Sequence, residues 1–222
     1  MGKEYFRHTI TRGLIPVGED LLFFDGFENL NNWTKSGSGG DEIFELDPHF
    51  AFSGKQSLYL KTRTTNAAEN DFLYCDRPTF LPPTMIAKAS FIWYGPTLAT
   101  AKNISFSIAF YDGGVLHEAT VFHYPASNKW FYYTTGPSEV EIPGSELDLS
   151  VNAWHRLQLA VDFFNSNYLY IRSDHKEHIL TGIPTYKSTA VVESRLILRP
   201  KITTVGAAPT DLHLDQVFMT ED

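Results

Sequence analysis

The sequence predicts an all-β protein built as an antiparallel sandwich of two sheets. Three observations carry this prediction: short segments of alternating apolar and polar residues, tight turns between them, and the absence of sustained helical periodicity. In the clearest segment, Ile104, Phe106, Ile108 and Phe110 fall on one face of an extended chain. Many short strands with turn signals and little helix are typical of such a sandwich.

The first part of the chain does not show the strand pattern. Residues 1–19 lack alternation and include Gly13, Pro16 and Gly18, which interrupt regular structure. We therefore divide the chain into an N-terminal arm, residues 1–19, and a single β-sandwich domain, residues 20–222. A sandwich of this length ordinarily forms one domain.

Two hairpins are predicted from their turns. Residues 104–111 and 115–124 are joined by Asp112-Gly113-Gly114, and residues 154–163 and 168–173 are joined by a turn at 165–167. Their apolar faces predict a core that contains Phe106, Ile108, Leu157, Leu159 and Val161. Further strands are expected at 41–47, 56–62, 86–94, 129–134, 177–180, 192–199 and 212–219. The proline-rich segment 78–84 is expected to be a loop.

Composition and charge restrict the partners and the cellular location that we expect for this protein. The chain has 222 residues and a net charge of −8, which repels phosphate, so we expect no nucleic-acid partner. No apolar run approaches the ~20 residues that span a bilayer, so we expect no membrane partner. The first residues lack the apolar core of a secretion signal, so we expect a protein of a virion, cytoplasmic before assembly. The single cysteine, Cys75, excludes an intrachain disulfide and is expected in the core.

Segments at the two ends of the chain carry a family pattern. Near the start lies FFDGFENLNNWTKSGSGG, followed by FELDPHFAFSGKQSLYL, and the last strand reads LHLDQVFMTED. Together they resemble the first and last strands of jelly-roll β-sandwiches of the carbohydrate-binding-module and concanavalin-like lectin type. The segment NAWHRLQLAVDFFNSNYLYI is similar to strands of laminin-G-like domains. The resemblance implies that the first and last strands are adjacent, and it concerns an architecture rather than one specificity.

Family members that hydrolyse β-glucans carry the motif E-x-D-x-x-E on one strand, where two carboxylates act as nucleophile and acid. The nearest approach in this chain is Glu146-Leu147-Asp148, whose third carboxylate would fall at Val151. The phosphate-binding, metalloprotease and serine-hydrolase motifs are also missing from the sequence. We therefore expect no enzymatic activity.

The resemblance also implies a structural Ca²⁺ between the opening and closing strands. The matching positions are Glu28 and Asp215, with Asp25 nearby, and carboxylate oxygens suit this hard cation. The second aspartate usual in the closing strand is replaced here by Gln216. Surface carboxylates at strand ends are the alternative interpretation.

The segment KWFYY, residues 129–133, places Trp130 and Tyr132 on one face of a strand and Phe131 and Tyr133 on the other. One face must be core, and the other then carries large aromatic rings that could bind a sugar or a protein. We take Trp130, Tyr132 and Tyr111 as the candidate ligand-binding residues. Packing of both faces in the core or under a loop is the alternative interpretation, and the sequence leaves open which face is exposed.

Two functions remain. The first is a non-catalytic structural or interaction protein of a larger assembly, and we expect a phage capsid decoration or tail protein that forms a homo-oligomer. In this hypothesis Tyr5, Phe6, Leu14 and Ile15 of the arm contact a neighbouring subunit. The alternative is a lectin-like module whose partner is a glycan.

Overall fold

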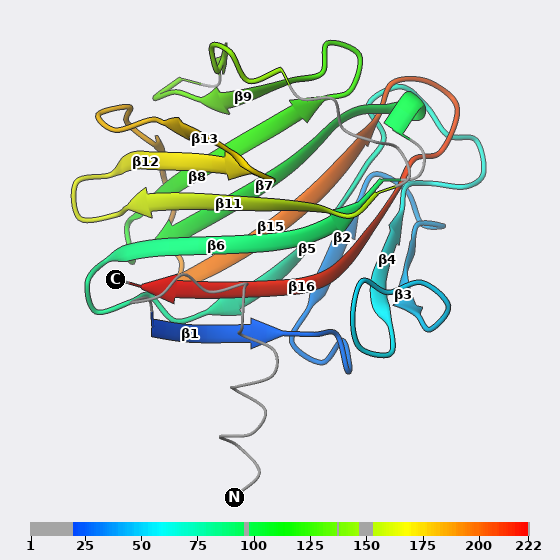
Figure 1. The fold of residues 1–222 in the computed structure, drawn as a ribbon, viewed down its shortest axis with the longest axis horizontal. Coiled ribbons are helices and arrows are strands. Elements are labelled where there is room, and N and C mark those ends of the chain that lie inside the picture. Colours follow the sequence, from blue (N-terminus) through cyan, green and yellow to red (C-terminus); the bar gives the residue numbers. More distant parts are fainter. Residues whose placement is uncertain (1–19, 96–97, 137, 147–152, 222) are drawn as a thin grey trace, which may run out of the picture.

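The computed structural model describes residues 20–95, 98–136, 138–146 and 153–221, and it shows two antiparallel sheets packed face to face (Figure 1). Sheet A contains, in spatial order, β13 (Lys176–Ile179), β12 (Asn167–Ser173), β11 (His155–Asp162), β6 (Ile86–Tyr94), β16 (Asp211–Glu221), β4 (Ser57–Lys61) and β3 (Ile43–Asp47). The first strand, β1 (Asp20–Asp25), pairs with β16, so the predicted adjacency of the first and last strands is confirmed.

Sheet B lies behind sheet A in Figure 1, and its strands cross those of sheet A at an angle. It contains, in spatial order, β10 (Glu139–Glu141), β9 (Lys129–Tyr133), β8 (Val115–Tyr124), β7 (Ala101–Tyr111), β15 (Arg195–Thr204), β5 (Phe72–Thr79) and β2 (Thr34–Gly37). Strand β14 (Tyr186–Thr189) pairs with the first half of β8, and a short 3-10 helix, Leu98–Thr100, precedes β7. Within the described part of the chain, no helix is long and apolar enough to cross a membrane.

The core lies between the two sheets, where the inward faces of β7 and β11 meet. Phe106, Ile108, Leu157, Leu159 and Val161 are all completely buried, as the alternating pattern predicts. The Cys75 thiol is buried in the same cluster, and burial raises its pKa well above the usual range. Removal of these apolar side chains from water is the main stabilising term of such a fold.

Strands β2, β5, β10 and β14 lie outside the predicted ranges. In β5, charged residues and Pro78 hide the alternation, and the strand extends to Thr79, so the predicted loop begins at Phe80. Pro78 pairs with Ile197 of β15 on one side and lies beyond the residues of β5 that β2 pairs with, 73–76, so on the β2 side no ladder hydrogen bond is lost.

One buried tyrosine ties the sheets together. Strand β8 pairs with β14 up to Glu118 and with β9 from Val121, which leaves the backbone of Thr120 between the two partners. The hydroxyl of Tyr168, on β12 of sheet A, accepts a hydrogen bond from Thr120 N (2.9 Å) and donates one to Thr120 O (3.2 Å). The side chain therefore satisfies backbone groups that a sheet partner would otherwise bind.

Candidate functional site: the outer face of sheet B

The centre of the outer face of sheet B is lined by small side chains. Ser105, Ser107 and Ala109 alternate along β7 with the core residues and point away from the core. They are only 1–3% exposed, although the described structure places no further layer of strands on this face. Larger side chains pair with them on both sides, Phe122 and Thr120 on β8 and Lys201 and Arg199 on β15. From this difference in size we infer that the row lies lower than its two borders, and we call it the recessed row.

One side of this recessed row is formed by β15 and β5. The rings of Phe72 and Tyr74 lie parallel, with centroids 6.0 Å apart and an interplanar angle of 8°. The Arg199 guanidinium lies 4.5 Å from the centroid of the Tyr74 ring and binds both carboxylate oxygens of Asp76, at 2.6 and 2.8 Å. This pairing with Asp76 raises the pKa of Arg199 despite its partial burial. The planar guanidinium is therefore fixed in orientation, with a flat ring beneath it.

The other side is formed by β8 and β9, which present a second group of aromatic rings. Phe122 packs against Tyr133 edge to face, with centroids 4.4 Å apart, and Tyr124 packs in the same way against Phe131 at 5.0 Å. Cross-strand pairing sets Phe122 next to Ser105, so these rings border the recessed row directly. Aromatic side chains thus flank the row on both sides.

Hydroxyl and carboxylate groups of β7 and β8 lie between the two groups of aromatic rings. The Thr120 hydroxyl donates to Glu118 Oε1 (2.7 Å), and the hydroxyls of Ser107 and Thr120 are 2.6 Å apart. Because the single proton of Thr120 is used on Glu118, Ser107 donates to Thr120. Ser107 and Thr120 are only 3% exposed, so the partly exposed Glu118 carboxylate is the group that can accept a hydrogen bond from a hydroxyl of a sugar whose apolar face packs on a ring.

The sequence-predicted ligand-binding residues divide between the two faces. Trp130 is completely buried, and Tyr132 packs against Tyr168 inside the sandwich, with ring centroids 5.8 Å apart. Their assignment as a ligand platform is therefore wrong, because β9 turns this pair toward the core. The opposite pair, Phe131 and Tyr133, faces outward.

Tyr111 lies on the outer face of sheet B, as a platform residue should. The Arg195 guanidinium lies 5.6 Å from the centroid of its ring. Sequence reasoning missed Phe72 and Tyr74 because β5 was not recognised as a strand, and it missed Arg199 because the neighbours of its predicted strand could not be inferred from the sequence. The aromatic and charged alternation in its first five residues, FLYCD, is the signal that could have found it.

The three predicted calcium ligands do not form one site. The Asp25 carboxylate accepts hydrogen bonds from Phe27 N (2.8 Å) and Trp33 Nε1 (2.9 Å) and lies 3.3 Å from Arg77 Nε. Glu28 is exposed, and Asp215 accepts a hydrogen bond from the backbone of Ser53 instead. Among the described residues, no group of three or more acidic, histidine or cysteine side chains could hold a metal. These residues therefore do not fit the Ca²⁺ that the resemblance implies.

We expect the melting temperature to be the same in EDTA and in excess Ca²⁺, because a metal that binds only the folded state would raise it. Differential scanning fluorimetry after chelation measures this directly. A rise of several degrees on Ca²⁺ addition would contradict the assignment of Asp25 to a hydrogen-bonded, arginine-paired role.

Asp215 instead occupies a bulge in β16. The pairing register between β16 and β6 shifts between Leu214 and Gln216, so Asp215 is the extra residue and its carboxylate turns toward the loop at residues 52–53. Burial raises the pKa of Asp215 to about 6, against the opposing effect of backbone hydrogen bonds from Ser53 and Phe52.

This shifted group predicts a pH-dependent stability. In the unfolded chain an aspartate titrates at about 3.9, so between about pH 4 and 6 the folded state binds the Asp215 proton more tightly. The stabilisation is complete below pH 4 and is lost as the pH rises through 6. His123, whose pKa burial lowers to about 4, acts in the opposite direction. The stability difference between wild type and Asp215→Asn isolates the aspartate.

Urea unfolding at intervals from pH 4 to 7.5 measures this difference. We expect Asp215→Asn to gain stability relative to wild type as the pH rises through this range. A difference that does not change with pH would show that the pKa of Asp215 is not raised.

One serine, one histidine and one aspartate meet on the outer face of sheet A. Ser57 Oγ lies 3.2 Å from His213 Nδ1, and Asp47 Oδ2 lies 3.8 Å from the same nitrogen. A catalytic relay needs the serine and the carboxylate on opposite ring nitrogens, and Ser57 is completely buried. This set is therefore structural.

In a second serine, histidine and aspartate set, the serine and the aspartate contact opposite nitrogens of the histidine ring, as they do in a catalytic relay. Ser166 Oγ lies 3.0 Å from His117 Nδ1, and Asp112 Oδ2 lies 3.3 Å from His117 Nε2. Ser166 is only 5% exposed and belongs to the turn between β11 and β12, whereas Asp112 begins the turn between β7 and β8. We interpret these hydrogen bonds as a structural link between the β11–β12 turn and the β7–β8 turn.

Aromatic rings also gather on sheet A, where the loop between β3 and β4 folds over it. Phe50 packs against Tyr94 (4.5 Å), His213 (4.7 Å) and Trp154 (5.4 Å), measured between ring centroids. Phe52, at its edge, is 49% exposed. These rings are largely engaged with one another, so they hold the loop in place rather than forming a free platform.

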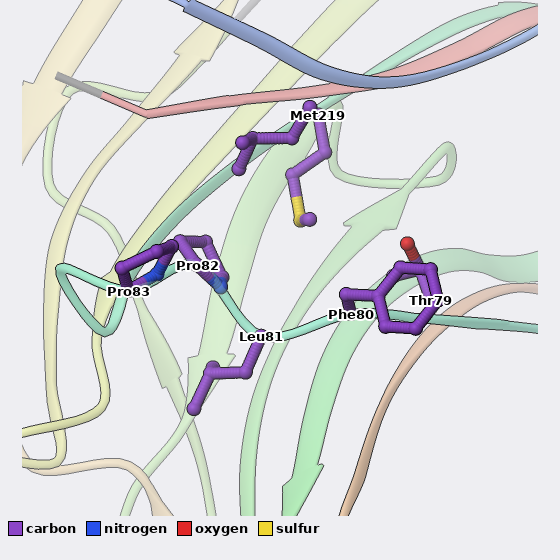
Figure 2. A pocket seen from close by; sticks show the side chains of 7 residues that line it. Thr79, Phe80, Leu81, Pro82, Pro83 and Met219 are labelled. Atoms are coloured by element: carbon purple, nitrogen blue, oxygen red, sulfur yellow. The ribbon is translucent and has the colours of Figure 1, made fainter.

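A cavity of about 310 Å³ lies between the β5–β6 loop and the β1–β16 pair (Figure 2). Leu22, Met219 and residues 79–83 line it, and Figure 2 shows the Met219 side chain pointing toward the proline-rich loop. The side chains that line it are apolar apart from Thr79, and none of them is charged.

No protein-family model matches the chain, and no curated protein is similar to it in sequence. Solved structures are similar in fold. Cellulose-induced protein Cip1 has a TM-score of 0.61 at 11% identity, over 89% of this chain and 96% of that one. Lectin I-B4 from Griffonia simplicifolia has a TM-score of 0.56 at 9% identity, over 90% and 99%. A carbohydrate esterase of the Shiga toxin-encoding bacteriophage phi24B has a TM-score of 0.55 at 14% identity, over 92% and 100%.

The fold is the lectin and carbohydrate-binding-module sandwich. The predicted all-β class and the resemblance of the chain ends to this architecture are thereby confirmed. At these identities the similarity concerns the fold of the lectin-like sandwich alone. The arm residues Tyr5, Phe6, Leu14 and Ile15, predicted to contact a partner, lie outside the described residues.

Proposed function

We propose that this protein is a non-catalytic, lectin-like module that binds a glycan on the outer face of sheet B. The observation that carries the proposal is the recessed row of Ser105, Ser107 and Ala109 between two groups of aromatic rings. Sugars present an apolar ring face and a rim of hydroxyls, and this surface offers a counterpart to each. Two structural neighbours, a carbohydrate esterase and a lectin, are described as proteins that act on or bind sugars, which supports the same class of ligand.

The non-catalytic part of the proposal is supported by the two serine–histidine–aspartate sets. In one, both partners contact the same histidine nitrogen, and in the other the serine is covered. Neither set lies on the outer face of sheet B. The proposed binding on the outer face of sheet B also requires no metal held by Asp25, Glu28 or Asp215.

Affinity electrophoresis tests the proposal. The protein is run through native gels that contain neutral or acidic plant and bacterial polysaccharides, with serum albumin as the reference. We expect retardation by at least one polysaccharide, and competition by its oligosaccharides. Migration equal to the reference in every gel, together with an empty glycan array, would overturn glycan binding.

A second candidate is a subunit of a phage virion, in the capsid or tail, which is cytoplasmic before assembly. The structural similarity to a protein of bacteriophage phi24B favours it, and it is compatible with glycan binding, since a virion protein can contact a cell-surface polysaccharide. Size-exclusion chromatography with light scattering tests the assembly: a homo-oligomer supports it, and a monomer at high concentration contradicts it.

A further inference from the structure

Lys201 stands on the outer face of sheet B without an anionic partner. Its register places it on β15 between Ser105 of β7 and Tyr74 of β5. Its ammonium lies 4.7 Å from the centroid of the Phe72 ring, and among the described residues no carboxylate oxygen lies within the 4.0 Å of an ion pair. The neighbouring cation, Arg199, is by contrast bound by Asp76 through two hydrogen bonds.

The surroundings of Lys201 disfavour its charge. Burial lowers its pKa first, and the positive charge of Arg199 lowers it further, while the more distant Glu118 acts in the opposite direction. Glu118 is itself engaged by the Thr120 hydroxyl. A partly buried cation without a partner costs stability, and such groups are characteristic of binding sites, where the ligand supplies the opposite charge.

The position of this charge matches one kind of ligand. The Phe72 and Tyr74 rings lie parallel, with the Lys201 ammonium over Phe72 and the Arg199 guanidinium over Tyr74, so a sugar bound against these two rings would bring a ring substituent to Lys201. We propose that Lys201 binds the acidic group, a carboxylate or a sulfate, of a sugar that contacts the accessible parts of Tyr74 and Phe72. This inference rests on the proposed glycan binding and specifies an acidic polysaccharide as its ligand.

The other charges on this face favour a sugar over a nucleic acid. Asp76, Glu118, Glu139 and Glu141 are distributed over β5, β8 and β10, so a polyphosphate chain crossing the sheet would be repelled at several points. An isolated acidic substituent can reach Lys201 without meeting these carboxylates.

The test compares a highly methyl-esterified polygalacturonate, whose free carboxylates are isolated along the chain, with the fully methyl-esterified form, which has the same backbone without the charge. A parallel arm compares sparsely sulfated dextran with dextran and so distinguishes sulfate from carboxylate, and a third arm uses single-stranded DNA. The proteins are wild type, Lys201→Gln and Lys55→Gln. Lys55 is an exposed residue in the loop beside sheet A, so its variant makes the same change in net charge away from the site.

We expect wild type to bind one of the acidic polymers at least about ten-fold more tightly than its neutral counterpart, with an affinity that falls as salt is added. Lys201→Gln should lose about ten- to a hundred-fold in affinity for the acidic polymer and little for the neutral one, whereas Lys55→Gln should behave as wild type. The melting temperature of Lys201→Gln should be unchanged or raised, because the variant removes an unpaired, partly buried charge.

Equal binding of acidic and neutral polymers by wild type, or an unchanged preference in Lys201→Gln, would overturn the inference. If a neutral polysaccharide still binds and Tyr74→Ala abolishes that binding, glycan binding is supported and the specificity for an acidic sugar is contradicted. If no polysaccharide binds wild type, both the proposed glycan binding and the acidic specificity are contradicted. Tighter binding of single-stranded DNA than of any polysaccharide would also overturn the inference.

Discussion

Replacing Leu159 by alanine is expected to lower the free energy of unfolding by about 2–5 kcal/mol. Leu159 is completely buried in the middle of β11, where it pairs with Ala89 of β6 and Ile171 of β12 and faces sheet B. Three strands fix the backbone around it, so the structure can collapse little into the space left by the side chain. The lost transfer free energy and the residual cavity therefore both contribute.

Urea unfolding followed by tryptophan fluorescence measures this loss, and Val191→Ala is the matched control. Val191 is 88% exposed in the segment that follows β14, so its truncation should change the free energy of unfolding by less than about 0.5 kcal/mol. Equal unfolding midpoints for Leu159→Ala and wild type would mean that this face of β11 does not form the core.

Alanine at Tyr74 or at Tyr133 is expected to weaken glycan binding by about thirty-fold each, the cost of losing a central aromatic contact. The two rings lie on opposite sides of the recessed row, on β5 and β9, so each variant removes one border of the proposed site. Tyr74→Ala also removes the ring beneath Arg199, but the bidentate contact with Asp76 remains to position the guanidinium.

Isothermal titration calorimetry with the polysaccharide identified in the gel screen measures the loss. Phe52→Ala is the control, because Phe52 is an exposed ring in the aromatic cluster on sheet A. It should bind as wild type does. Loss of binding in Phe52→Ala with retention in both tyrosine variants would move the site to sheet A and remove the basis of the proposed function.

The two hairpins illustrate why part of the fold could be predicted from sequence. In β7 and β11 an apolar residue recurs at every second position, and the alternation determines which side of the strand is buried. Their core residues therefore follow from local pattern alone. In β5, the order FLYCDRPT mixes aromatic, charged and proline residues because its outer face is occupied by Tyr74 and Asp76, so the same rule did not identify the strand.

The candidate site shows the limit of the same reasoning. Strand β9 reads as aromatic on both faces, and its Trp130 side is buried only because β8 and the Tyr168 side of sheet A lie against it. Ser107, Glu118 and Tyr133 come from the consecutive strands β7, β8 and β9, whereas Tyr74 and Arg199 come from β5 and β15, which are distant in sequence and adjacent in sheet B. The proximity of these two groups depends on strand order, which no local pattern encodes.

The sequence by itself determined the all-β class, the two hairpins, the buried face of β7 and β11, and the adjacency of the chain ends, because side-chain alternation, turn residues and the end segments are all visible in the chain. Only the tertiary structure decided which aromatic rings are exposed, that Asp25 is held by Trp33 and Arg77, and that Lys201 lies over the Phe72 ring with no ion-pair partner among the described residues. The physical reason is that exposure, pairing and desolvation are properties of contacts between strands, and those contacts exist only once the two sheets have formed and packed.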